Sequence, residues 1–161
     1  MKGKLSCAVL YFFGLYVMIQ GMTLDLQNIQ EYYKCWIYAQ CFSDGPAAKQ
    51  FGNCITNNLT PKDLNDTYQS AIKTYGNYNS DTFDGAVKEM CNQNDEKRRE
   101  TYKNEMNGFF SYKKKICNDP DAQGLCSRLS GFVQCASSLL NRLKQNDQCK
   151  VDGPIQNYVS V

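Results

Sequence analysis

The sequence predicts an all-α single domain of about five to six amphipathic helices stapled by four disulfides. From residue 22 onward, apolar residues recur at the spacings of three and four that a helix requires. No stretch of useful length alternates between apolar and polar residues as a strand would. The cysteines that follow residue 22 are even in number, which is typical of a disulfide framework.

The first 21 residues have the layout of a secretory signal peptide. Lys2 and Lys4 precede an apolar run from Leu5 to Ile19, and Gly21 suits the last position before a cleavage site. An uncleaved membrane anchor is the alternative, but it needs about 20 apolar residues and this run is shorter. The predicted segments are a signal peptide over 1–21, a helical disulfide-rich domain over 22–150 and a C-terminal tail over 151–161.

Cleavage would change both the cysteine count and the charge. It removes Cys7 and leaves an even set: Cys35, Cys41, Cys54, Cys91, Cys117, Cys126, Cys135 and Cys149. Such a set in a secreted chain implies four disulfides, for which 105 pairings are possible. Loss of Lys2 and Lys4 makes the chain neutral, which argues against a general attraction to nucleic acid. We therefore expect a secreted, extracellular protein without a membrane span after cleavage.

The N-terminal half is expected to hold four helices, separated by helix-breaking residues. An apolar stripe within Leu24 to Phe42 ends at the turn 43–45, and Pro46 suits the first position of a short second helix. Thr60 and Pro61 begin a third helix, which Gly76 ends. A fourth follows, capped by Ser80 or Asp81. The stripe of the third helix comprises Leu64, Tyr68, Ala71, Ile72 and Tyr75.

Two longer helices are expected in the C-terminal half. The fifth runs from about Asp95 to Ile116 and ends at Asn118-Asp119-Pro120. The sixth runs from about Asp121 to Lys144, with an apolar face that includes Leu129, Phe132 and Leu140.

The cysteine positions constrain how these helices are joined. Cys126 and Cys135 lie nine residues apart on the sixth helix, roughly 13 Å along its axis. A disulfide needs Cα atoms within about 7 Å, so each must reach a different neighbouring element. The first and fifth helices each end at a tight turn, and cysteines that flank such a turn are brought together. This geometry favours the pairs Cys35–Cys54 and Cys117–Cys126.

The sequence argues against an enzyme or a metal site. It contains no histidine, which excludes Ser-His-Asp and Cys-His triads and histidine-dependent zinc sites. The segment from Asp119 begins like a calcium loop, but Ser130 stands where the bidentate Glu is required. Carboxylate pairs such as Asp81 and Asp84 remain for acid–base chemistry, although helix capping explains them better. We expect no catalytic residue, no metal and no cofactor.

Two basic clusters and two glycosylation sequons remain. Lys97-Arg98-Arg99 and Lys113-Lys114-Lys115 are interpreted as solvated helix faces, with an anionic partner as the alternative. Asn58 and Asn65 each begin an Asn-X-Thr sequon and are candidate N-glycosylation sites.

Aromatic residues are numerous for one helical domain and have two interpretations. They either fill a plain core or line an apolar cavity with tyrosine hydroxyls for orientation. On the second interpretation, the ligand-binding candidates are Tyr33, Trp36, Tyr68, Tyr75, Phe109 and Phe132.

The C-x₈-C spacing of Cys126 and Cys135 on a late helix resembles that of arthropod odorant-binding proteins. The chain is also similar to secreted helical cysteine-rich families of arthropods and nematodes. Odorant-binding proteins combine this spacing with a C-x₃-C motif, which this sequence lacks. The resemblance implies a helical carrier fold and transfers no functional residue.

We expect a secreted, non-enzymatic helical protein that carries a small apolar ligand. The alternative is a secreted effector, of a venom, saliva or host-directed kind, that binds an extracellular protein partner through its surface. A buried cavity favours the carrier, and an exposed aromatic patch favours the effector.

Overall fold

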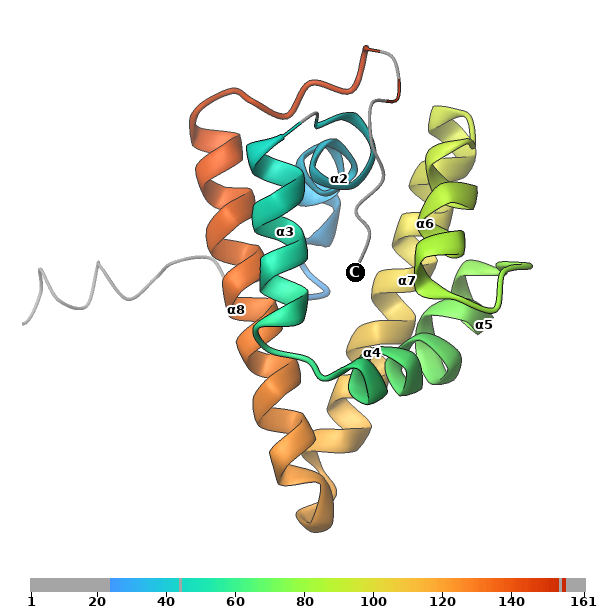
Figure 1. Ribbon diagram of the computed structural model, residues 1–161, viewed down its shortest axis with the longest axis vertical. Coiled ribbons are helices and arrows are strands. Elements are labelled where there is room, and N and C mark those ends of the chain that lie inside the picture. Colours follow the sequence, from blue (N-terminus) through green and yellow to red (C-terminus); the bar gives the residue numbers. More distant parts are fainter. Residues whose placement is uncertain (1–23, 44, 154, 156–161) are drawn as a thin grey trace, which may run out of the picture.

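The computed structural model describes residues 24–43, 45–153 and 155, and the regular structure in these ranges is entirely helical (Figure 1). The all-α prediction is therefore confirmed. The predicted signal peptide over 1–21 lies outside the described residues, as does most of the predicted tail over 151–161. Within the described part of the chain, no helix combines the length and the apolar character needed to cross a membrane.

The helices follow the predicted order, with two π-helical turns that the sequence did not indicate. In chain order the elements are α2 (Ile29–Ile37), the π-turn η1 (Tyr38–Phe42), α3 (Pro46–Thr56), α4 (Pro61–Thr67), the π-turn η2 (Tyr68–Ile72), α5 (Lys73–Gly76), α6 (Phe83–Cys91), α7 (Asp95–Cys117), the 3₁₀ turn η3 (Pro120–Ala122) and α8 (Gln123–Gln145). Because α4, η2 and α5 are contiguous, they form one helical segment with a π-turn in its middle.

The two long helices α7 and α8 form a V that organises the other elements (Figure 1). They meet at the narrow end through η3 and diverge toward the other end. Helix α2 packs against both arms, α3 packs along α8, and the segment from α4 to α5 packs along α7. Helix α6 lies beside α7 on the same side of the V.

Four disulfides tie these elements together, and each joins different elements of the fold. Their pairs are Cys35–Cys149, Cys41–Cys91, Cys54–Cys135 and Cys117–Cys126. The expected pair Cys117–Cys126 is present across the η3 turn, with Cα atoms 4.9 Å apart. Cys126 and Cys135 bind two different helices, α7 and α3, as their separation along α8 requires.

The expected pair Cys35–Cys54 is wrong. It assumed that α3 folds back antiparallel on α2, but Figure 1 shows α2 nearly end-on while α3 lies lengthwise in the plane of the picture. The π-turn η1 extends α2 before the chain turns, and α3 packs instead on α8. Cys54 therefore reaches Cys135 on α8, and Cys35 holds Cys149 in the segment that follows α8.

The observed helix starts confirm one predicted cap, correct a second and shorten the first helix. Thr60 caps α4 and Pro61 occupies its first turn, as predicted, and Asp63 completes a capping box with Thr60. The first helix begins at Ile29 rather than Leu24, which leaves Leu26 50 % exposed. Thr82, not Ser80 or Asp81, caps α6 by accepting a hydrogen bond from the Gly85 N–H at 3.1 Å.

The core is rich in tyrosines whose rings are buried and whose hydroxyls bind distant elements. Tyr32 donates to Asn141 Oδ1 at 2.7 Å and Tyr102 donates to the Ile29 carbonyl at 2.8 Å. A buried hydroxyl is costly unless it is hydrogen-bonded, so each bond fixes the position of one element against another. Many of the aromatic residues of this chain therefore have a structural role in the core.

Arg98 departs from the predicted solvated basic face. It is only 7 % exposed, and its guanidinium donates to the carbonyls of Met90, Cys91 and Gln93. These acceptors lie at the C-terminal end of α6, where backbone carbonyls lack helical partners. Arg98 thus joins the start of α7 to the end of α6.

Peptide mapping without reduction tests the disulfide framework. We expect cross-linked peptides containing Cys35 with Cys149 and Cys54 with Cys135, and no free thiol after denaturation. Recovery of Cys35 linked to Cys54 would contradict the packing of α3 on α8.

Candidate functional site

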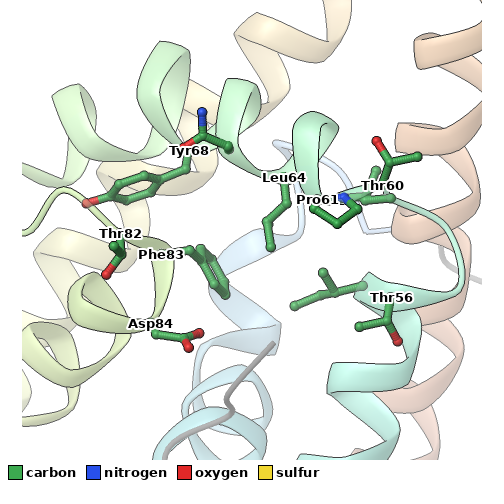
Figure 2. A pocket seen from close by; sticks show the side chains of 11 residues that line it. Thr56, Thr60, Pro61, Leu64, Tyr68, Thr82, Phe83 and Asp84 are labelled. Carbon is green, nitrogen blue, oxygen red and sulfur yellow. The ribbon is translucent and has the colours of Figure 1, made fainter.

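A largely apolar groove lies between the α3–α4 connection and the start of α6 (Figure 2). Its volume is about 480 Å³, within the range of small-molecule sites. Figure 2 shows Leu64 and Phe83 pointing toward the centre of the groove from opposite walls. The lining residues are Ile55, Thr56, Leu59, Thr60, Pro61, Leu64, Asn65, Tyr68, Thr82, Phe83 and Asp84.

One wall of the groove is fixed by the start of α4. Asp63 closes the capping box with Thr60 and also accepts two hydrogen bonds from Arg128 of α8, at 2.8 and 2.9 Å. Together Arg128 and Thr60 hold the pKa of Asp63 well below its usual range, although burial opposes them. This bidentate pair anchors α4 to α8 and so sets where Leu64 stands.

The opposite wall depends on the loop between α5 and α6. The Tyr68 hydroxyl donates to the Ser80 carbonyl at 2.6 Å, and Glu89 of α6 accepts hydrogen bonds from the backbone N–H groups of Asn79 and Ser80. Asn77, the residue after α5, adopts a left-handed conformation that turns the chain into this loop. These contacts place Phe83, the first residue of α6, at the groove.

Behind the groove lies a second, smaller and more enclosed space of about 30 Å³. Ile55, Leu59, Leu64 and Phe83 line both spaces, so they form the partition between them. The inner void is surrounded by the aromatic cluster of the core, to which Trp36, Phe51, Phe109 and Phe132 belong. Apolar voids of this kind stay dry, which leaves room for a small apolar group.

Four of the six predicted ligand-binding residues lie at these two spaces. Trp36, Phe109 and Phe132 line the inner void, and Tyr68 lines the groove. Tyr33 lies elsewhere, where it donates to Asp95 Oδ1 at 2.8 Å beneath the Arg99 guanidinium. Tyr75 is 48 % exposed and covers Gly108 of α7, so its predicted inward position is wrong.

The sequence placed the cavity around Trp36, whereas the larger hollow is at the surface. The core around Trp36 leaves only the inner void, because the rings of Phe51 and Phe132 pack against the indole. The missed residues are Ile55, Leu59, Leu64 and Phe83. Their apolar periodicity was visible, but periodicity alone does not distinguish a core residue from a groove residue.

No three histidine, cysteine, aspartate or glutamate side chains within the described ranges are placed to hold a metal ion.

Comparison with known proteins found no matching family model, no matching curated protein and no matching solved structure. A proposal for the function of this protein therefore rests on the groove and on the side chains that line it.

Glu105 is a buried carboxyl in α7 that lies beside the Tyr78 hydroxyl. Burial raises its pKa from 4.5 to about 8, and the Tyr78 hydroxyl partly offsets this increase. The folded chain therefore holds Glu105 protonated at pH values where the unfolded chain ionises it. The free energy of unfolding therefore decreases as the pH rises from about 4.5 toward 8.

We expect Glu105→Gln to remove this loss of stability. The amide keeps the shape of the side chain and a neutral hydrogen-bonding group. The free energy of unfolding of the variant should therefore exceed that of the wild type at pH 8 and differ little from it at pH 5. Each pH unit within the window contributes at most about 1.4 kcal/mol. Denaturant unfolding at the two pH values measures the change. Glu100→Gln, at an exposed position of the same helix, is the control, and an equal effect of both variants would contradict the assignment.

The two sequons differ in their surroundings. The Asn58 side chain donates to the Cys54 carbonyl at 2.8 Å, and its Oδ1 lies close to Gly131 of α8, where an added Cβ would stand 2.4 Å away. The amide of Asn58 is thus enclosed between two helices. Asn65 is exposed on α4.

We expect N-glycosylation at Asn65 and not at Asn58 when the chain passes through a eukaryotic secretory pathway. A glycan on Asn58 would crowd the contact with Gly131 and separate α3 from α8, whereas the exposed Asn65 side chain at the edge of the groove can carry one without moving the helices. Glycopeptide mapping distinguishes the two sites. A glycan found at Asn58 would show that the contact with Gly131 does not form.

Proposed function

We propose that this protein is a secreted, non-enzymatic carrier that binds a small apolar ligand in the groove between α4 and α6. Secretion is supported by the four disulfides, which persist in oxidising compartments. Ligand binding is supported by one observation above all. An apolar groove of about 480 Å³ adjoins an apolar void across a partition of four side chains.

The energetics favour a ligand at this place. Leu64 and Phe83 are held at the groove by contacts that involve other residues, namely the Asp63–Arg128 pair and the Thr82 cap. The groove is therefore preorganised, and little ordering cost falls on the protein when a ligand binds. Burial of apolar ligand surface contributes about 25 cal/mol per Å², which after binding costs supports affinities of order micromolar.

Titration with a fluorescent naphthylamine probe tests the proposal. We expect saturable binding together with a change in the fluorescence of Trp36, because this single tryptophan lies at the inner void behind the groove. Leu64→Glu should reduce the affinity at least about tenfold, since it places a charge on the apolar floor of the groove.

Leu26→Glu is the matched control for this experiment. Leu26 is exposed, lies outside the groove, and should tolerate the same substitution without loss of affinity. Circular dichroism verifies that both variants fold. Absence of saturable binding to the wild type, or an equal loss in both variants, would overturn the carrier function.

A protein-binding effector is the second candidate, and one surface feature favours it. Leu26 and Phe110 line a shallow hollow together with Lys113 and Lys114. Leu26 is exposed and Phe110 half-buried, and Asp25 is the one acidic residue of this lining. Apolar side chains beside a pair of lysines suit an acidic protein partner. On this alternative, Leu26→Glu would weaken binding of the partner and Leu64→Glu would not.

A further inference from the structure

The inner void behind the groove has the size of one small chemical group. Its volume is about 30 Å³, which is close to the space that a single water molecule or methyl group occupies. A water molecule is retained only where several polar groups bind it. Only Thr67 and the indole of Trp36 have polar side-chain atoms in this lining, and its other side chains are apolar. The void therefore suits the end of a hydrocarbon chain better than water or a polar group.

Only side chains separate this void from the groove. The partition consists of Ile55, Leu59, Leu64 and Phe83, which line both spaces. Leu64 of α4 and Phe83 of α6 are half-buried, and Figure 2 shows them pointing toward the same space from opposite walls. Rotation of these two side chains would open a path for a thin chain while the backbone of both helices stays in place.

The threonine hydroxyls at the rim of the groove are already engaged within the fold. Thr60 donates to Asp63 Oδ2 at 2.7 Å, and Thr82 accepts from the Gly85 N–H at 3.1 Å. Both bonds belong to the caps of helices. Thr56 donates to a backbone carbonyl of its own helix. The apolar end of a ligand therefore finds a more distinctive environment here than its headgroup does.

We propose that the groove binds a straight-chain ligand tail first, with its terminal methyl group in the inner void against Trp36. This inference rests on the carrier function and specifies its ligand class and orientation. The chain passes between Leu64 and Phe83, and the headgroup stays at the rim. A ligand that ends in a ring or a branched group fits the groove but not the void, because a close-packed core accommodates extra methyl groups only at a cost in free energy.

Brominated alcohols test the orientation of the bound chain. A bromine atom is close to a methyl group in size and quenches indole fluorescence on contact. In 11-bromoundecanol it stands in place of the terminal methyl group of dodecanol, whereas in 2-bromododecanol it lies beside the hydroxyl group. Trp36 is the single tryptophan of the chain and lines the void. We expect saturating 11-bromoundecanol to remove most of its emission and 2-bromododecanol to remove little.

A branched isomer tests the selection of straight chains. 9,9-Dimethyldecanol has the same number of carbon atoms as dodecanol but ends in a tert-butyl group, which is too wide for the inner void. We expect dodecanol to bind at least about fivefold more tightly, since overpacking of a fixed apolar site is unfavourable. Displacement of the bound naphthylamine probe measures both affinities.

The variant Phe83→Ala should bring the ratio of these two affinities close to one. Removal of the ring joins the void to the groove and makes room for the branched end. Phe42→Ala is the matched control, because Phe42 is also a half-buried phenylalanine at the core but lines neither space. This control should keep the preference for dodecanol, and circular dichroism verifies that both variants fold.

The outcomes separate the tail-first orientation from the carrier function. Equal quenching by the two bromo-alcohols, or stronger quenching by 2-bromododecanol, would overturn the orientation while the groove remains a carrier site. Equal affinities for dodecanol and its branched isomer, or a preference that survives Phe83→Ala, would overturn the role of the void in selection. If neither alcohol displaces the probe, or the probe itself does not bind, the carrier function is wrong as well.

Discussion

The divergence of α7 and α8 from the Cys117–Cys126 disulfide is the constraint on which the rest of the fold depends. Two helices that meet at one end cannot pack against each other along their full length, so their apolar faces must be covered by other elements. Helix α2 fills the space between the arms with two aromatic side chains. Tyr33 and Trp36 both contact Tyr102 of α7, and Trp36 also contacts Phe132 of α8. The width of the V thus explains why this core requires large rings.

The same divergence accounts for the position of the groove. Helix α3 is tied to α8 by Cys54–Cys135, whereas α6 is tied to η1 by Cys41–Cys91 and to α7 through Arg98. These two helices therefore belong to opposite arms of the V. The segment from Leu59 to Leu64 leads from α3 into α4 and lines the groove, which lies between the C-terminal end of α3 and the start of α6. Disulfides make the separation of the arms a fixed feature, which suits a preorganised site.

The sequence predicted the parts of this structure that depend on local chemistry. The helices, the cap at Thr60 and the disulfide across the η3 turn follow from periodicity, caps and short loops. It did not predict features that depend on tertiary packing. The steep crossing of α2 and α3 redirected Cys54 to α8, and the π-turn η1 lies in a stretch with no distinctive residue pattern.

The candidate site was partly predictable for the same reason. The sequence predicts Trp36, Phe109 and Phe132 as residues that line a cavity, but whether a cavity forms there depends on how closely Phe51 packs against Trp36 and Phe132. Leu64 and Phe83 line the groove because two elements end beside each other, a relation that no single amphipathic pattern contains. The burial of Arg98 and Glu105 was equally hidden, since both have the local sequence of exposed helical residues.

The most direct test of the groove as a ligand site is nuclear magnetic resonance of protein labelled at isoleucine and leucine methyl groups. Addition of dodecanol should shift the methyl signals of Ile55, Leu59 and Leu64, which line the groove, and leave those of Leu26 and Leu143 unchanged. Shifts centred on Leu26, or no shifts at the groove residues under saturating ligand, would contradict the assignment of the groove as the binding site.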